Sequence, residues 1–166
     1  MGGSSVKLVA DTLALEAVAK DPGNGRRIGG SVWAPVNMHN PYGDFWFYAS
    51  HLVEICMEVF GTDIRAVQAV KTEKAVIANV CYADLIVSLH FAADVWQNHA
   101  CTLVTVDGTV TLPLDTAGSL DQEATRFAKL LQGNYESMSY EELVRPVVIM
   151  DAILRAEVTG ATVFLS

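Results

Sequence analysis

Five β-rich segments in the middle of the chain constrain its fold more than any other feature. They are residues 64–72, 75–82, 85–93, 99–106 and 109–114, and short polar turns separate them. The third shows the alternation of a half-buried strand, with Leu85, Leu89 and Phe91 on one face. Asp107 and Gly108 between the last two segments are a strong hairpin signal. Five consecutive strands with short links predict an antiparallel meander.

Two elements are predicted near the start of the chain. Residues 11–20 have the pattern of a short helix that Asp11 could cap. Residues 30–38 have the pattern of a strand, and Pro35 interrupts it. Proline cannot donate to a ladder of backbone hydrogen bonds. Either this strand therefore lies at an edge of the sheet, or Pro35 marks the end of the strand.

The segment 44–61, with the sequence DFWFYASHLVEICMEVFG, joins these elements to the β-rich region. Five of its apolar residues recur at helical spacing: Leu52, Ile55, Cys56, Val59 and Phe60. This pattern predicts a helix with one face on the core. Ser50 is the expected N-cap, and Gly61 is the expected left-handed residue after the last turn.

The last third of the chain is predicted to be mainly helical. Capping boxes begin at Ser119 and at Ser139, so each should open a helix. The first helix is expected to turn five residues inward: Leu120, Ala124, Phe127, Ala128 and Leu131. The second should run to about Thr159, with Pro146 kinking it or loosening its first two turns. Residues 161–165 follow as a closing strand.

These elements predict one α+β domain over residues 1–166, with a large, mainly antiparallel sheet and helices packed on one face. Hydrophobic residues make up 51% of the chain, and the mean hydropathy is +0.29. That value is high for a monomer whose sheet has one face open to solvent. We therefore expect a homo-oligomer, most simply a dimer, formed through the open sheet face.

Charge and cysteine content limit the partners and the compartment. The net charge is −8 and the pI about 4.8, which argues against nucleic acid and against anionic membrane surfaces. No apolar run approaches the roughly 20 residues that a membrane span needs. The three cysteines are far apart and form no C-x-x-C pair, so neither a disulfide framework nor a zinc knuckle is expected. A reducing, cytoplasmic location fits this pattern.

His51 is the one candidate catalytic residue. It lies one helical turn before Glu54, so a carboxylate could tune an imidazole that acts as a general acid or base on a substrate hydroxyl. The alternative is a structural histidine that packs against the aromatic residues before it. No spacing among the four histidines predicts a metal site.

Two groups next to this helix are candidates for substrate binding, together with Glu54. Asn37 and His39 could line a cleft, or they could simply form a turn. Trp46 and Tyr48 could stack on a sugar ring, or they could pack between helix and sheet. The glycine-rich stretch 23–30 is not a dinucleotide fingerprint, because Ile28 stands where the third glycine should be. No cofactor is therefore expected in this chain.

Three stretches resemble the C-terminal domain of the Gfo/Idh/MocA family of NAD(P)-dependent oxidoreductases. SSVKLVAD at the start is similar to the family's crossover out of its nucleotide domain, which would make residues 1–28 a crossover helix and link. FYASHLVEICMEVFG resembles the segment that carries the family's active-site histidine, here His51. SYEELVRPVVIMDAILRAEVTGATVFLS resembles its closing helix and strand. Three features depart from the family: the Rossmann domain is absent, the family's lysine motif is absent with it, and Phe47 replaces an acidic residue four positions before the histidine.

The resemblance implies the substrate-binding and oligomerisation half of an oxidoreductase. Its parent protein would use NAD or NADP to oxidise or reduce a sugar, a cyclitol or a related polyol, and the isolated chain should be inactive. Two alternatives stay open: a non-enzymatic dimerisation or small-molecule-binding module on the same fold, and a split enzyme with its nucleotide domain on a separate chain.

Overall fold

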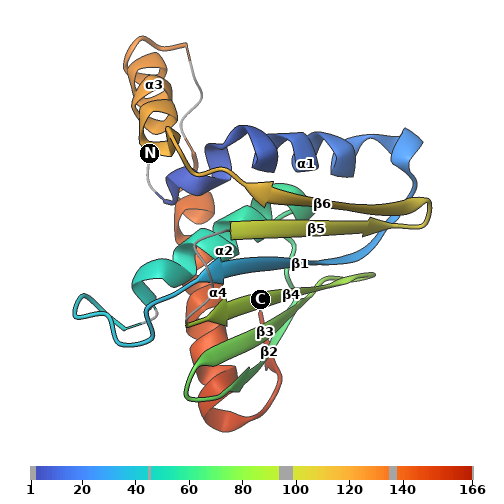
Figure 1. Cartoon of the computed structure of the whole chain (residues 1–166), viewed down its shortest axis with the longest axis vertical. Helices are drawn as coiled ribbons and strands as arrows, with labels where there is room; N and C mark the ends of the chain where they lie inside the picture. The colour runs from blue at the N-terminus through green and yellow to red at the C-terminus, as the bar shows by residue number, and fades with distance from the viewer. Residues whose placement is uncertain (1–2, 45, 94–98, 135–137, 166) are drawn as a thin grey trace.

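A computed structural model describes residues 3–44, 46–93, 99–134 and 138–165 (Figure 1). Seven strands form one sheet in the order β6-β5-β1-β4-β3-β2-β7. The strands are β1 Arg27–Pro35, β2 Ala66–Lys71, β3 Ala75–Cys81, β4 Ile86–Ala92, β5 His99–Thr105, β6 Gly108–Leu114 and β7 Val163–Phe164. All neighbouring strands are antiparallel except β1 and β4, which are parallel. The sheet is therefore mixed but mainly antiparallel, as predicted.

The helices confirm the α+β class. They are α1 Ala10–Lys20, α2 Trp46–Phe60, α3 Ser119–Leu131 and α4 Tyr140–Thr159, with short 3-10 turns η1 at Ser5–Leu8 and η2 at Pro22–Asn24. In Figure 1 α2 and α4 lie behind the sheet, and the other face of the sheet is turned toward the viewer. Fully buried side chains of α2, such as Leu52 and Ile55, share the core with Leu89 and Phe91 of β4. No helix of the described residues combines the length and the hydrophobicity required to cross a membrane.

The position of β1 corrects the predicted meander and decides between the two predictions for Pro35. β1 is a central strand that separates β4 from β5, so it is not an edge strand, whereas the alternative that the strand ends at Pro35 is correct. The meander is consequently broken after β4, although β2, β3 and β4 form one antiparallel run and β5 and β6 another. Pro35 does not prevent this placement because it is the last residue of the strand, and the backbone N–H of Val36 resumes bonding to Ala92.

Close packing also explains a glycine in β1. A Cβ atom on Gly30 would lie 2.3 Å from the ring of Phe60 and 2.4 Å from the carbonyl oxygen of Thr102. Only a residue without a side chain fits between the end of α2 and β5 there. Arg27, at the start of the same strand, donates hydrogen bonds to the carbonyl oxygens of Val59 and Phe60. The glycine- and arginine-containing stretch thus fixes the C-terminal end of α2.

Helix α2 begins earlier than the sequence predicted. Its first residue is Trp46, so the aromatic residues form its first turn and Ser50 lies inside it instead of capping it. The predicted end is correct: Gly61 has a φ of +98° and its N–H bonds to the carbonyl of Met57. Asp11 is not the cap of α1 either, since Val9 occupies that position and the Asp11 carboxylate accepts the N–H of Asp115.

Helix α3 corrects a further prediction. None of its residues is buried, and Leu120 and Leu131 are each 72% exposed. Figure 1 shows α3 extending away from the sheet beside the N-terminal end of the chain. Its N-cap residue is Gly118, and the hydroxyl of Ser119 accepts a hydrogen bond from Ser5 instead of closing a capping box. The five apolar residues expected to face inward therefore have no core to face.

Helix α4 agrees better with its prediction. Ser139 and Glu142 make both hydrogen bonds of a capping box, and Gly160 ends the helix with a φ of +65°. The helix runs without a break through Pro146. The closing strand is shorter than expected, only Val163–Phe164, and pairs with β2.

Candidate functional site

His51 lies in the second turn of α2, and its imidazole is partly buried. Its Nδ1 atom is 2.5 Å from the hydroxyl oxygen of Ser4, which comes from the N-terminal segment ahead of η1. No hydrogen bond to Nε2 is found among the described residues. Burial lowers the pKa of His51, so the ring is neutral at pH 7. One ring nitrogen is therefore held by the protein, and the other has no hydrogen-bond partner in the part of the chain that the structure describes.

Glu54 does not contact His51 as the one-turn spacing suggested it could. Its side chain is buried, and its Oε1 accepts the backbone N–H of Ser4 at 2.8 Å. Its Oε2 pairs with the ammonium group of Lys7 at 2.6 Å. Among the described residues Glu54 is thus linked to His51 through Ser4, and its carboxylate charge is compensated by Lys7.

A second histidine approaches His51 from the sheet. His99, the first residue of β5, has its ring centroid 6.1 Å from that of His51, in an edge-to-face arrangement. Burial, and secondarily the charge of His51, lower the pKa of His99 to about 4. The ring of Tyr48 lies 6.3 Å from His51 on the same helix. Two neutral imidazoles and a phenol therefore lie together where α2 meets β5.

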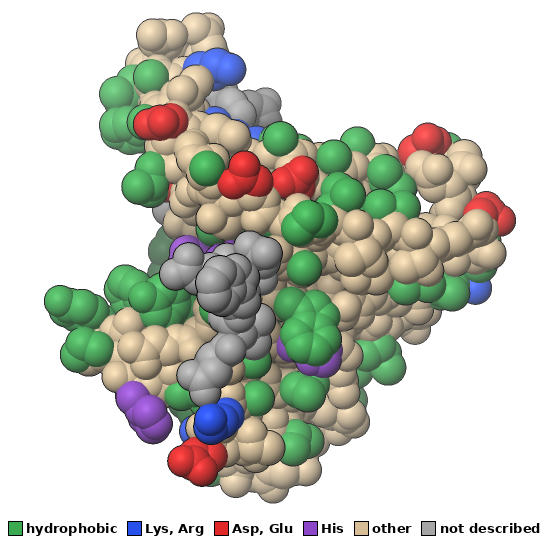
Figure 2. Space-filling model, in the orientation of Figure 1, with side chains coloured by type: hydrophobic (Ala, Val, Ile, Leu, Met, Phe, Trp, Pro, Cys, Tyr) green, Lys and Arg blue, Asp and Glu red, His purple; other side chains and the backbone are tan. Residues whose placement is uncertain are grey.

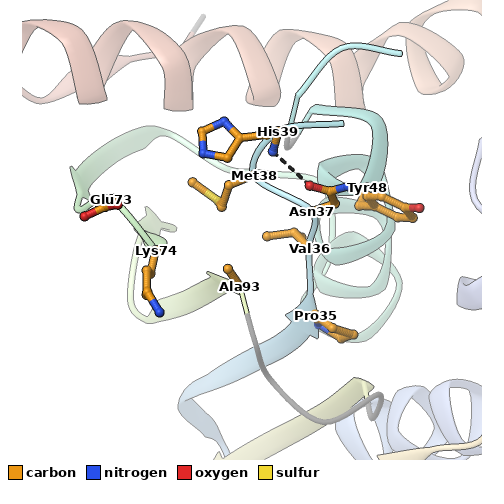
Figure 3. A pocket seen from close by; sticks show the side chains of 9 residues that line it. All are labelled: Pro35, Val36, Asn37, Met38, His39, Tyr48, Glu73, Lys74 and Ala93. Carbon is orange, nitrogen blue, oxygen red and sulfur yellow. Dashed lines mark hydrogen bonds between the residues drawn. The ribbon is translucent and has the colours of Figure 1, made fainter. Parts of the chain in front are cut away.

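Asn37 and His39 lie in a different place, a groove between the loop after β1 and the β2–β3 turn. The groove encloses about 630 Å³ and is lined by Pro35, Val36, Asn37, Met38, His39, Tyr48, Glu73, Lys74 and Ala93. Figure 3 shows Glu73 and Lys74 across the groove from Asn37 and Tyr48. The side chain of Asn37 accepts the backbone N–H of His39, so this pair does form a turn. His51 is not a lining residue of this groove.

Tyr48 connects the two places, because it lines the groove and its ring is also near His51. Trp46 and Tyr48 are half-buried and pack against the core, whereas Phe47 is 51% exposed. Phe47 makes an edge-to-face contact with Tyr48 at 5.0 Å. The remaining aromatic residue of this cluster, Phe45, lies outside the described residues.

Three residues at this site were missed by sequence reasoning: Ser4, Lys7 and His99. Ser4 and Lys7 are about 50 positions from their partners on α2, so no local pattern could indicate them. His99 had a usable signal. It shares the alternation of Cys101 and Leu103, which face the helices, so it could have been assigned to the same face as α2.

Cysteine and metal chemistry find little support at this site. All three cysteines are free, and burial raises the pKa of Cys56 and Cys101 to about 12. Such thiols stay protonated and are poor nucleophiles. In the part of the chain that the structure describes, no three histidine, cysteine or acidic residues are placed to hold a metal ion. Neutral imidazoles and hydroxyls suit hydrogen bonding to a polar, uncharged substrate.

Comparison with solved structures supports the α+β fold described above. No family model and no curated protein sequence matches the chain. Among solved structures, GenD2 from gentamicin A biosynthesis, in complex with NAD, matches with a TM-score of 0.81 and 15% identity over 98% of this chain and 62% of that one. A myo-inositol dehydrogenase from Corynebacterium glutamicum matches with a TM-score of 0.80 and 12% identity over 98% and 63%. The WlbA dehydrogenase from Bordetella pertussis, in complex with NADH and UDP-GlcNAcA, gives 0.76 and 14% over 96% and 62%.

The chain has the fold of the C-terminal domain of the Gfo/Idh/MocA oxidoreductases. It spans 62 to 63% of the length of these three solved structures. At such low identities the likeness establishes the fold, and the chemistry has to be argued from this chain's own residues.

Proposed function

We propose that this chain is the substrate-binding and oligomerisation domain of an NAD(P)-dependent oxidoreductase that acts on a sugar, a cyclitol or a related polyol. The observation that carries this proposal is the His51 imidazole, which is neutral, partly buried and bonded through Nδ1 while Nε2 has no partner among the described residues. The fold, and the NAD or NADH bound in two of the similar structures, support the cofactor of the parent protein.

The charges around His51 favour an uncharged polyol as the substrate. Lys7 is the cation of this cluster, and Glu54 pairs with it. Anionic substrates such as nucleotide sugars need a cation to compensate their phosphates. Polyol hydroxyls can bond instead to Nε2 of His51 and to the phenol of Tyr48. A neutral cyclitol or sugar therefore suits the site better than a nucleotide sugar.

Binding of a polyol can be measured directly on the purified chain. Titration with myo-inositol should shift the imidazole NMR signals of His51, and the shift should reach a plateau as the myo-inositol concentration rises. The signals of His90, on the opposite face of the sheet, should stay in place. His51→Ala should remove the saturable binding. Equal, unsaturated drift of all histidine signals would show that the polyol does not occupy this site.

Dinucleotide binding is expected to reside elsewhere in the active protein. The glycine-rich stretch before and within β1 serves packing, since Gly30 lies against Phe60 and Gly25 adopts a φ of +74° beside Asp107. It does not form a phosphate cradle at the start of a long helix. Calorimetric titration of the chain with NADH and NADPH should show no measurable heat of binding. A micromolar Kd for either would contradict this part of the proposal.

The open face of the sheet supports a role in oligomerisation. Across β6 to β2 the residues on this face include no Asp, Glu, Lys or Arg: Gly29, Ser31, Trp33, Ala66, Gln68, Val70, Ala75, Ile77, Asn79, Cys81, Ile86, Ser88, His90, Ala92, Ala100, Thr102, Val104, Thr109, Thr111 and Pro113. Figure 2 shows this face with acidic and basic groups mostly at its margins. Trp33 stacks on His90 at 3.7 Å near its middle. An uncharged face of this kind suits a second copy of the chain.

A non-enzymatic small-molecule-binding module is the second candidate. The groove around Asn37 and His39 favours it, because this groove is separate from His51 and contains both Glu73 and Lys74. If myo-inositol moved the signals of His39 and not those of His51, the groove would be the binding site and the dehydrogenase assignment would lose its basis.

A further inference from the structure

The hydroxyl group of Ser4 has two polar neighbours, and they determine where its proton lies. Ser4 is 4% exposed. Its Oγ is 3.1 Å from the backbone nitrogen of Val6, which can only donate, and 2.5 Å from Nδ1 of His51. No third polar partner of this hydroxyl is found among the described residues. The contact with His51 therefore decides whether the hydroxyl hydrogen is bonded.

Two arrangements of the proton are possible between Ser4 and His51. If Nδ1 carried a hydrogen and donated it, Oγ would accept twice and its own hydrogen would have no acceptor. A donor left unpaired in a buried place is strongly disfavoured. If Ser4 donates to Nδ1, the buried hydroxyl hydrogen has an acceptor, and the donor without a partner among the described residues is instead the Nε2–H of a ring that is only partly buried. The second arrangement is therefore the one that satisfies the buried hydroxyl.

We propose that Ser4 is a positioning residue that fixes His51 as the tautomer protonated at Nε2. His51 then presents an N–H donor on the side away from Ser4, not a lone pair. This deepens the proposed function and rests on it for the identity of the substrate. In the free domain His51 would orient and polarise a substrate oxygen by donating a hydrogen bond, and it would not by itself remove a hydroxyl proton.

The neighbouring residues hold Ser4 in the required position. Its backbone N–H donates to Glu54, and Lys7 holds the other oxygen of that carboxylate. Glu54 therefore acts on the position of Ser4 and not on the basicity of His51. His99 is also uncharged at pH 7, because burial lowers its pKa to about 4. No charged group thus competes with Ser4 for Nδ1 among these residues.

The tautomer can be observed directly in the intact chain. With ¹⁵N-labelled histidine at pH 7, long-range ¹H–¹⁵N correlation spectra distinguish a protonated ring nitrogen from an unprotonated one. His51 should show a protonated Nε2 and an unprotonated Nδ1, while the exposed His39 serves as the reference. A protonated Nδ1 in the unaltered chain would overturn the proposal, and this result needs no variant.

Variants of Ser4 provide the second test. Ser4→Ala should move both His51 nitrogen shifts toward the average of two exchanging tautomers, and Ser4→Thr, which keeps the hydroxyl, should restore the original pattern. Ser5→Ala is the matched control, because that hydroxyl bonds to Ser119 and not to His51. Unchanged His51 shifts in a folded Ser4→Ala chain would contradict the role of Ser4. A failure of myo-inositol to bind would count against the proposed function and leave the measured tautomer unaffected.

Discussion

The imidazole of His99 makes the free energy of unfolding of this chain depend on pH, and the direction of this dependence follows from the shift of its pKa. Its pKa is about 4 in the folded chain, because burial and the neighbouring His51 disfavour its charged form, against about 6.5 in an unfolded chain. Between these values the unfolded chain binds more protons than the folded one. The contribution of the neutral His99 ring to the free energy of unfolding is therefore complete above pH 6.5 and is lost as the pH falls toward 4.

We expect the free energy of unfolding to fall by on the order of 1 kcal/mol between pH 7 and pH 5, a figure reduced for the partial exposure of the ring. Urea unfolding at the two pH values measures it. His99→Gln should flatten the dependence, whereas His39→Gln, an exposed site, should leave it as it is. Parallel behaviour of the two variants would exclude His99 as the cause.

At the scale of single residues, the sequence predicted position better than contact. The helical period placed His51 and Glu54 on one helix, and this is correct. It did not reveal that the side chain of Glu54 bonds to the backbone of Ser4, 50 positions away. His51 has one nitrogen bound within the protein and a ring that is only partly buried, and its catalytic role stays a prediction. Such contacts depend on how distant segments pack, which no local pattern encodes.

At the scale of elements, hydrophobic periodicity predicted which segments form helices and strands. It did not predict which strands lie next to each other in the sheet. Pro35 predicted either an edge position or the end of the strand, and the second is correct, because the ladder needs no donor from the last residue of a strand. The register that inserts β1 between β4 and β5 brings Val32 opposite both Leu89 and Cys101. This pairing joins residues more than 50 positions apart, so short links between strands gave the wrong adjacency.

Helix α3 provides the prediction at this scale. Its amphipathic pattern predicted burial, but pattern alone cannot supply a surface to pack against. Leu131 is 72% exposed, so Leu131→Ser should change the free energy of unfolding by less than about 0.5 kcal/mol. Ile149 of α4 is fully buried, and Ile149→Ala should cost about 2–5 kcal/mol by leaving a cavity. Chemical denaturation of both variants tests this. A large cost for Leu131→Ser would mean that α3 packs on the protein in solution.

At the scale of the whole molecule, the open sheet face is the feature that calls for a partner. Its residues include Trp33, Ile77 and Ile86, which are 41%, 42% and 54% exposed, and no Asp, Glu, Lys or Arg lies between them in the strand register. The high mean hydropathy of the sequence predicts such a surface. A second copy covering this face would have to bury roughly 1,200 Å² to form a stable interface.

A single charge placed on this face should therefore weaken the association of two copies of the chain. Ile86 lies on β4 in the middle of the sheet, and Ile86→Lys would bury an unpaired ammonium group if two copies met there. We expect the unaltered chain to sediment as a dimer at micromolar concentration and Ile86→Lys to weaken dimerisation by on the order of 100-fold, that is, a few kcal/mol. Val158→Lys is the matched control, since Val158 is an exposed apolar residue of α4, away from this face. Because both sites are exposed in the single chain, neither change should impair folding. An unaltered chain that sediments as a monomer, or a Val158→Lys chain that dissociates while Ile86→Lys does not, would place the contact elsewhere.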